Sequence, residues 1–364
     1  MVLHAAVSAA EWEAGLLEPA KLAALARQFT ADGYAVIGNA IPASALDALR
    51  ERMDYDAAHQ AATRKFEERG PNSGAGGHLQ MGPPRMAPHI TKELVASPVL
   101  EQLAVALLSA GLLEPLDEVY LSFFNGNTNI PGSGSQLLHS DGGWVVSTQQ
   151  DADAIGEAWP CPTADLVFNF STDDVTEAEG PTQLWPATHT EAALATGAVA
   201  QRTAAGFKDP VAAAAEEAAR RVVRPPVPNV LPRGAVSVRD YRLWHRGVPN
   251  TGTRPRHMIA LSYSRRTLHP SRVPKPGKTP SGGGASGRFL FGHNCVGAFS
   301  REWWPATAKA ALLKNSEKPW PVNFNVDFAP PGVSTPTPPV PSALLLLPMV
   351  LSVFWFCSSR LLIS

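Results

Sequence analysis

The chain has 364 residues, of which 45% are hydrophobic, and a formal net charge of −1 from 31 basic and 32 acidic side chains. This balance, without a long basic helix, excludes a protein that binds nucleic acid through its net charge. The sequence has three widely spaced cysteines, Cys161, Cys295 and Cys357, which excludes a disulfide scaffold and predicts an intracellular, cytoplasmic protein.

The N-terminal part is predicted to be mainly helical. A helix ends at Asp32-Gly33, a short strand covers residues 34–37, and Pro42 opens a second helix. Residues 70–88 are rich in glycine and proline and predict a long loop, followed by a helix at about 91–110. The apolar stripes behind these helices are Leu22, Leu25 and Phe29; Leu46, Leu49 and Met53; and Val95, Leu100, Leu103 and Leu107.

From Val119 onward the sequence favours strands. Short runs rich in β-branched and aromatic residues alternate with turn residues. The predicted strands are 119–124, 165–171, 182–185, 235–244 and 257–264. An alanine-rich block at 191–221 predicts a helix between two of them. The fold class predicted is therefore mostly β with flanking helices, arranged as a sandwich or barrel.

The C-terminal part divides into a linker and a tail. We predict one domain over residues 1–329, a proline-rich linker over 330–342 and a hydrophobic tail over 343–364. Residues 343–357 carry no charge, but fifteen uncharged residues fall short of the roughly 20 apolar residues that a membrane-spanning helix needs. The tail is a candidate membrane anchor; a segment packed on the domain and a tail without a role remain the alternatives.

Two histidines and one aspartate have the composition of an iron site. His139-Ser140-Asp141 forms an H-x-D step, His245 follows 104 residues after the aspartate, and Arg256 lies eleven residues further on. Residues i and i+2 of a strand share a face, so His139 and Asp141 can reach one ion. A facial triad of this kind holds Fe(II) and leaves three positions open. We expect His245 to end the strand 235–244 and Arg256 to begin the neighbouring one.

The same pattern also arises without function. An H-x-D tripeptide is common, and ten histidines make a distant partner easy to find by chance. Asp240 and Arg242 are predicted to form an ion pair, either purely structural or orienting His245. Two further histidines, His78 and His89, lie in or beside the glycine- and proline-rich loop, where solvated side chains are expected.

Four blocks in order resemble the phytanoyl-CoA dioxygenase family of Fe(II)/2-oxoglutarate-dependent oxygenases, over about residues 25–264. They are Phe29-Thr-Ala-Asp-Gly-Tyr34; Pro131-Gly-Ser-Gly-Ser-Gln136 leading into His139-Ser-Asp141; Glu179-Gly-Pro-Thr182 with Trp185-Pro-Ala-Thr-His189; and Arg239-Asp-Tyr-Arg-Leu-Trp-His-Arg-Gly247 with Asn250 and Arg256. Glu179 and Ala187 depart from the family pattern, which has asparagine and glycine there, and this leaves the local loop geometry open.

The resemblance implies a double-stranded β-helix, a jelly-roll or cupin-like barrel. It implies that His139, Asp141 and His245 ligate iron and that Arg256 binds the far carboxylate of 2-oxoglutarate. Further co-substrate contacts are implied at Gln136 and Asn169; for Asn169 an ordinary polar strand residue is the alternative. Trp144 is a candidate wall of the substrate pocket, with a core aromatic as the alternative.

The implied reaction hydroxylates a small organic molecule and converts 2-oxoglutarate and O2 to succinate and CO2. The carboxylate of Asp141 favours hydroxylation over halogenation, because related halogenases carry a small residue at this position. Desaturation, epimerisation and ring closure by the same chemistry stay open, as does a barrel that binds a ligand without turnover. The substrate need not be phytanoyl-CoA, because one fold serves many substrates.

Overall fold

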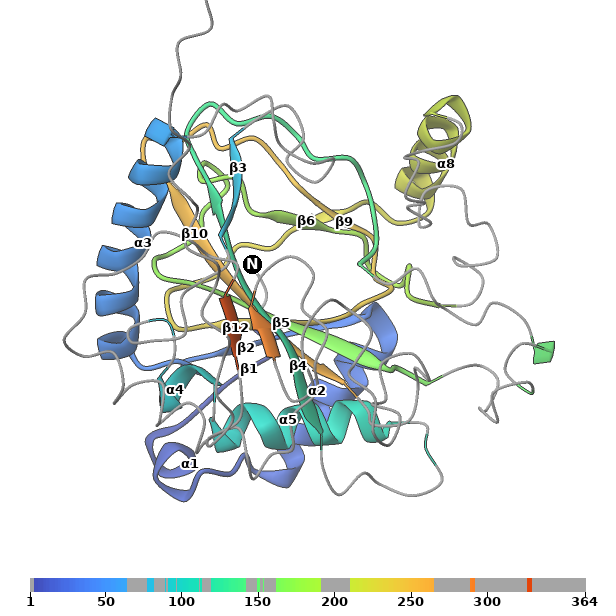
Figure 1. The fold of residues 1–364 in the computed structure, drawn as a ribbon. Helices are drawn as coiled ribbons and strands as arrows, with labels where there is room; N and C mark the ends of the chain where they lie inside the picture. Colours follow the sequence, from blue (N-terminus) through green and yellow to red (C-terminus); the bar gives the residue numbers. More distant parts are fainter. Residues whose placement is uncertain are drawn as a thin grey trace, which may run out of the picture. The chain divides into compact units, whose positions relative to one another are not determined.

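A seven-stranded sheet forms the centre of the protein, whose computed structural model is drawn in Figure 1. The residues described are 3–63, 77–81, 91–95, 97–110, 119–141, 162–190, 210–264, 289–291 and 326–328, with 89, 112, 149, 150 and 153. In spatial order the strands are β1 (Ala5–Ala6), β2 (Tyr34–Gly38), β8 (Val236–Asp240), β5 (Asp165–Ser171), β10 (Arg256–Ser264), β4 (Tyr120–Asn129) and β3 (His78–Met81). All neighbours pair antiparallel except β1 with β2.

A smaller sheet is formed by three strands that lie between β5 and β10 in the sequence. Its order is β7 (Val227–Pro228), β6 (Thr182–Leu184) and β9 (His245–Gly247), all antiparallel. A separate pair joins β11 (Phe289–Phe291) to β12 (Val326–Phe328). The prediction of a mostly β fold with flanking helices is confirmed.

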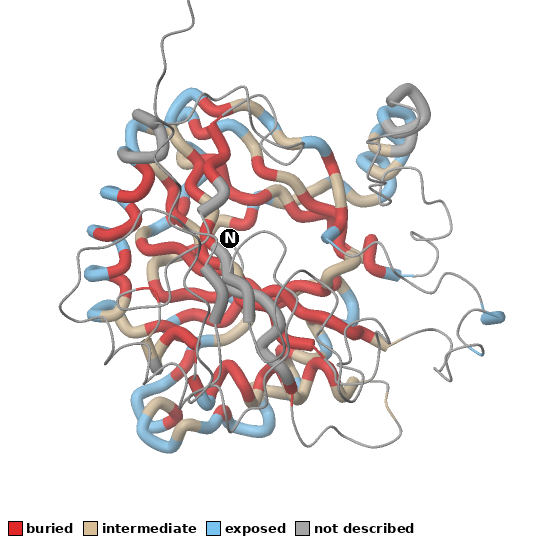
Figure 2. The backbone as a smooth tube through the Cα atoms, viewed as in Figure 1, coloured by how far each residue is buried: buried red, intermediate tan, exposed pale blue. Residues whose placement is uncertain are grey.

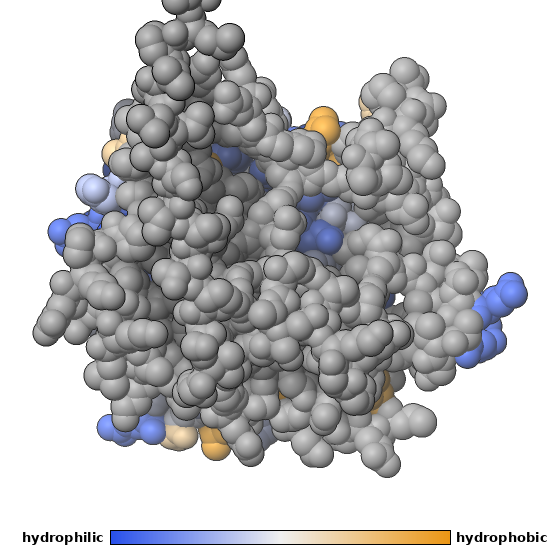
Figure 3. Space-filling view, viewed as in Figure 1, coloured by the Kyte–Doolittle hydropathy of each residue, from blue (hydrophilic) through white to orange (hydrophobic). Residues whose placement is uncertain are grey.

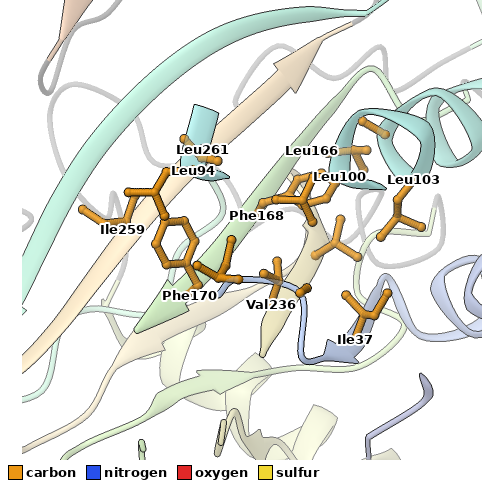
Figure 4. Packing of buried hydrophobic residues seen from close by; sticks show 14 of the residues in the cluster. Ile37, Leu94, Leu100, Leu103, Leu166, Phe168, Phe170, Val236, Ile259 and Leu261 are labelled. Atoms are coloured by element: carbon orange, nitrogen blue, oxygen red, sulfur yellow. The ribbon is translucent and has the colours of Figure 1, made fainter. Parts of the chain in front are cut away.

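Helices pack against one face of the large sheet. They are α1 (Ala9–Ala14), α2 (Pro19–Asp32), α3 (Ala43–Thr63), α4 (Lys92–Val95) and α5 (Pro98–Ser109); α8 (Pro210–Val223) follows later in the chain. Apolar side chains of α2 and α5 join those of the central strands in one buried cluster. Figure 4 shows Leu100 and Leu103 of α5 against Leu166 and Phe168 of β5, and Figure 2 shows the central strands buried along most of their length.

The strands of the large sheet bury different chemistry on their two faces. In β5, Leu166, Phe168 and Phe170 point into the apolar cluster, so Asn169 faces the other way. In β8, Val236 and Val238 belong to the same cluster, which leaves Ser237 and Arg239 on the face of Asn169. All three polar residues are at least 95% buried. The sheet therefore presents a buried polar face away from the helices.

Three predicted elements needed correction. The helix expected at 91–110 is two helices, because Ser97 caps α5 and Pro98 occupies its first turn. The loop expected at 70–88 contains strand β3, whose His78 is buried rather than solvated; His89 is buried as well. The run 235–244 is not one strand: β8 stops at Asp240, and His245 begins β9 in the smaller sheet.

The predicted linker at 330–342 and tail at 343–364 lie outside the described residues, as does the first part of the helix predicted at 191–221. In the described part of the chain, no helix has the length and hydrophobicity to span a membrane. Large exposed hydrophobic side chains there are few (Leu3, Leu16, Tyr55, Leu137, Val222 and Val223), and hydrophobic residues at the surface in Figure 3 are scattered. Single residues of this kind are ordinary on a protein surface.

We expect Glu11 to make the N-terminal stability depend on pH. Its carboxylate completes a capping box with Ser8 and pairs with Lys21. Burial alone would raise the pKa of Glu11, but the Lys21 ammonium and the N–H groups of Glu18 and Ser8 lower it to about 2. Because this pKa lies below the unfolded value, the carboxylate stabilises the fold fully above about pH 5, and this is lost as the pH falls through about 2.

Glu11→Gln keeps a side chain that can complete the capping box and removes the charge that faces Lys21, so it should lower the free energy of unfolding at pH 7 by about 0.2–1 kcal/mol, the range for an ion pair near the surface. Urea unfolding at pH 7, 5 and 3 should show the gap to the wild type narrowing at the lowest pH. Glu13→Gln, at an exposed position of the same helix, is the control. A gap that stays constant over this range would contradict the proposed role of the carboxylate.

Candidate metal centre

The segment 131–141 runs beside β9 and places the first two candidate ligands. Backbone hydrogen bonds join Gln136 N to Gly247 O (2.9 Å), His139 N to His245 O (3.0 Å) and His245 N to His139 O (2.8 Å). Asp141 N donates to Tyr241 O at 3.0 Å. His139 makes one isolated β-bridge, to His245, and lies in no regular strand. The expectation that the H-x-D step lies in a strand is therefore wrong. The main chain still brings His139 and Asp141 beside His245.

The three predicted ligands converge on one point. One donor atom each from His139, Asp141 and His245 lie within 4.8 Å of one another. The Nε2 atoms of His139 and His245 lie 3.9 and 3.6 Å from Asp141 Oδ1. The two imidazole rings have centroids 4.4 Å apart. Two imidazole nitrogens and one carboxylate oxygen in this arrangement match the donor set of a facial-triad iron site.

Both imidazoles are held in the tautomer that a metal needs. His139 Nδ1 lies 2.7 Å from Leu137 O, and His245 Nδ1 lies 2.9 Å from Leu243 O. Because a carbonyl oxygen only accepts, each Nδ1 carries the proton and each Nε2 presents its lone pair. Burial, followed by the Arg239 guanidinium, lowers the pKa of His245 well below its ordinary value and keeps its ring neutral. These backbone contacts orient the rings as outer contacts do in metal sites.

Arg239 is the site residue that the sequence interpretation missed. Its Nη2 donates to Asp141 Oδ2 at 2.5 Å, and its Nε donates to Asn169 Oδ1 at 3.1 Å. Burial alone would raise the pKa of Asp141, but Arg239, His245 and His139 hold it well below its usual range. The alternation Val236, Ser237, Val238, Arg239 in the sequence was the signal that places this arginine on the polar face. Asn169 thus lies in the site and contacts Arg239.

Arg256 lies at the start of β10 as predicted, but β10 belongs to the large sheet and does not pair with β9. Arg256 is 4% exposed; its Nη1 donates to Met258 Sδ at 3.4 Å, and its Nε has no hydrogen-bond partner. Within the described residues, no carboxylate forms an ion pair with it. Burial lowers the pKa of Arg256 to about 10, so the guanidinium is still charged at neutral pH. A buried, charged guanidinium with no carboxylate partner in the described part of the chain fits the carboxylate of a ligand.

Gln136 and His78 both lie against Gly247 of β9. Gln136 Oε1 accepts from Gly247 N at 2.8 Å, which fixes the loop before His139 to β9. His78 pairs with Asn129, which also pairs with Arg256, so the three residues form one row across the sheet. Burial lowers the pKa of His78 to about 4, with Arg256 adding to the shift. His78 is therefore neutral beside the guanidinium.

The turn before His245 is fixed by the predicted ion pair. Asp240 accepts from Arg242 Nε (2.8 Å) and Nη2 (2.6 Å), and Thr163 Oγ1 donates to it at 2.7 Å. Burial would raise the pKa of Asp240, whereas Arg242 lowers it, and the net shift is downward. Thr188 Oγ1 accepts from Trp244 N at 2.9 Å on the other side of the turn. The Asp240–Arg242 ion pair fixes the chain where it passes from β8 of the large sheet to β9 of the smaller sheet.

The two departures from the family pattern, Ala187 and Glu179, both lie in hydrogen-bonded turns. Ala187 has φ 62°, in the left-handed region that favours the glycine usual in the family, and the turn still places Thr188 against Trp244. Glu179 accepts hydrogen bonds from the backbone N–H and hydroxyl of Thr176. Trp144, the candidate pocket wall, lies outside the described residues.

Comparison with known proteins adds the following. The model of the family described as phytanoyl-CoA dioxygenase (PhyH) matches residues 29–258. Similar solved structures are the non-heme alpha-ketoglutarate-dependent carbocyclase SnoK from nogalamycin biosynthesis (TM-score 0.46, 15% identity, 69% of this chain and 85% of that one) and the epimerase SnoN in complex with Fe3+, alpha-ketoglutarate and nogalamycin RO (0.46, 15%, 78% and 96%). AviO1 from Streptomyces viridochromogenes Tue57 is also similar (0.42, 18%, 68% and 96%). The family match includes all three candidate ligands and Arg256.

Proposed function

The chain belongs to the phytanoyl-CoA dioxygenase family, and from this premise we propose that it hydroxylates a small organic molecule with O2 at the His139–Asp141–His245 centre. Membership bears out the predicted family and, together with the seven-stranded and three-stranded sheets, the predicted jelly-roll barrel. The enzyme depends on iron and 2-oxoglutarate. The observation that carries the proposal is the convergence of the three donor atoms within 4.8 Å.

Each polar group of the site has a distinct task in this proposal. His139 Nε2, His245 Nε2 and Asp141 Oδ1 would hold the iron. Arg256 would bind the far carboxylate of 2-oxoglutarate through its unpartnered Nε and the rest of its fork. When bound, iron and 2-oxoglutarate supply O2 activation coupled to oxidative decarboxylation, which leaves succinate and CO2. The carboxylate of Asp141 supports hydroxylation, because it occupies the position that a halogenase leaves to a halide.

Anaerobic titration with Fe(II) and then 2-oxoglutarate tests the centre. We expect a visible metal-to-ligand charge-transfer band only when both are present, because it requires the keto acid on the metal. A set of small organic substrates is then screened for bleaching of the band by O2 and for succinate. A protein that forms no band and no succinate, yet binds one of these molecules tightly, would support the alternative of a barrel without turnover.

Labelled O2 then decides the outcome of the reaction. Hydroxylation places one labelled oxygen atom in the product for each succinate formed. Desaturation, epimerisation and ring closure consume the same co-substrates but leave the product without a new labelled oxygen. Unlabelled product with stoichiometric succinate would thus reject hydroxylation and keep the iron- and 2-oxoglutarate-dependent chemistry.

A further inference from the structure

The two oxygens of Asp141 have different surroundings. Oδ1 faces the imidazoles, 3.9 Å from His139 Nε2 and 3.6 Å from His245 Nε2. Oδ2 accepts from Arg239 Nη2 at 2.5 Å. The carboxylate therefore presents one oxygen to the candidate metal position, and its other oxygen is engaged by a guanidinium. Asp141 is also the most exposed of the three groups, with 31% of its side chain accessible, so packing alone does not fix its rotation.

Arg239 is itself held in place. Its side chain is 6% exposed, and the Nε that neighbours Nη2 on the same edge of the guanidinium donates to Asn169 Oδ1 at 3.1 Å. Arg239 lies on β8 and Asn169 on the adjacent strand β5, so the bond crosses between paired strands of the large sheet. One edge of the planar Arg239 guanidinium thus connects Asn169 of the large sheet to the candidate metal ligand Asp141. A lysine has a single point charge and cannot make both contacts in this fork geometry.

We propose that Arg239 is a positioning residue that holds Asp141 as a one-oxygen ligand, with Asn169 fixing the arginine. The inference rests on the proposed metal centre. A carboxylate that gives one oxygen leaves three positions open beside two imidazoles. If Oδ2 were released, the carboxylate would be free to offer both oxygens and close a position that the keto acid or O2 needs. The role of Asn169 Oδ1 is then to anchor Arg239; its Nδ2 is buried without a hydrogen-bond partner, so the co-substrate contact predicted for Asn169 stays a prediction.

Arg239→Lys tests this role, because it keeps the positive charge beside Asp141 and removes the fork. Co(II) is the probe, since its visible bands report both binding and coordination number without turnover. We expect Arg239→Lys to weaken Co(II) binding about 10- to 100-fold, the range for groups that orient metal ligands. We also expect the weaker bands of higher coordination, and a fall in kcat larger than any rise in KM for 2-oxoglutarate.

Arg52→Lys is the matched control. Arg52 also grips a buried carboxylate with two nitrogens, 2.7 and 3.1 Å from Asp56, but on helix α3. It should change thermal stability and leave the Co(II) spectrum as in the wild type. Should Arg239→Lys fail to fold, Asn169→Ala keeps the arginine and its charge, and we expect the same spectral change with a smaller loss of affinity. The double variant Arg239→Lys/Asn169→Ala should be no worse than Arg239→Lys alone, because both act through one contact.

The outcomes are separable. Wild-type affinity and spectrum in Arg239→Lys, or in Asn169→Ala if that is the variant that folds, would overturn the positioning role while leaving the metal centre intact. Additive losses in the double variant would also reject the relay from Asn169 through Arg239. Wild-type protein that binds no Co(II) would instead overturn the proposed function itself.

Discussion

Replacing His245 with alanine is expected to abolish iron binding and iron-dependent succinate formation. The Nε2 of His245 is one of three donor atoms, and two donors cannot hold the ion firmly. Activity should fall below about 1% of the wild type, because even groups that only orient a ligand cost 10- to 100-fold when changed. Dialysis against Fe(II) followed by metal analysis measures binding, and succinate formed from 2-oxoglutarate measures turnover.

The same loss is expected for Asp141, but alanine there has a second effect. It would leave the buried Arg239 without its carboxylate and destabilise the fold; because 31% of the Asp141 side chain is accessible, the cost should be below the about 3–5 kcal/mol of a fully buried pair. Asp141→Asn keeps a hydrogen-bond acceptor for Arg239 and separates loss of the metal from loss of the fold. His4→Ala is the control, because His4 is a partly exposed histidine that is far from the triad in the sequence. Near-normal turnover in a folded His245 or Asp141 variant would remove that residue from the triad.

Arg256→Met is expected to have the second-largest effect, on the binding of 2-oxoglutarate. Truncating one partner of a buried, hydrogen-bonded charge pair costs about 2–5 kcal/mol, or about 30- to several-thousand-fold in affinity. The Kd for 2-oxoglutarate, read from the charge-transfer band under anaerobic conditions, should rise by that factor. Fe(II) binding should stay close to the wild type, because Arg256 is not among the three donors.

Thermal unfolding gives this prediction a second readout. Burial of an unpaired guanidinium disfavours the empty protein, so Arg256→Met should melt at a higher temperature than the wild type without 2-oxoglutarate. Adding 2-oxoglutarate and metal should stabilise the wild type and hardly change the variant. Arg254→Met, two residues away and 57% exposed, is the matched control. Equal stabilisation of both variants by 2-oxoglutarate would show that its far carboxylate binds elsewhere.

Secondary structure was predictable where residue patterns are regular. The periodic Leu25 and Phe29 with Gly33 behind them predicted α2 and its end, and β5 has the predicted bounds. The pattern failed where a local signal outweighed periodicity. Ser97-Pro98 starts a helix inside an apolar stripe, and β3 is a four-residue strand among glycines and prolines that forms only because β4 lies beside it.

The sequence predicted which residues donate to the metal, but it did not predict the contacts that hold those residues in place. Spacing and resemblance identified the three ligands and Arg256, and the structure brings the ligands together. Arg239 was missed because the run 235–244 was interpreted as one continuous strand leading to His245. Its role depends on Asp141, 98 residues earlier, and on a pairing between β5 and β8 that no local pattern contains. Asn169 was predicted on the polar face from the alternation of its strand, but its hydrogen bond to Arg239 was not; its co-substrate contact stays a prediction.

His139 and His245 are joined through their peptide groups as well as placed ring to ring. Each donates its N–H to the carbonyl of the other, so their Cα positions are set without help from either side chain. Evolution can exchange an imidazole here for a thiolate or a second carboxylate while the scaffold stays in register, and the preference for a metal follows the new donor. Over evolutionary time, the identity of the bound ion is therefore easier to change than the position of its site in the fold.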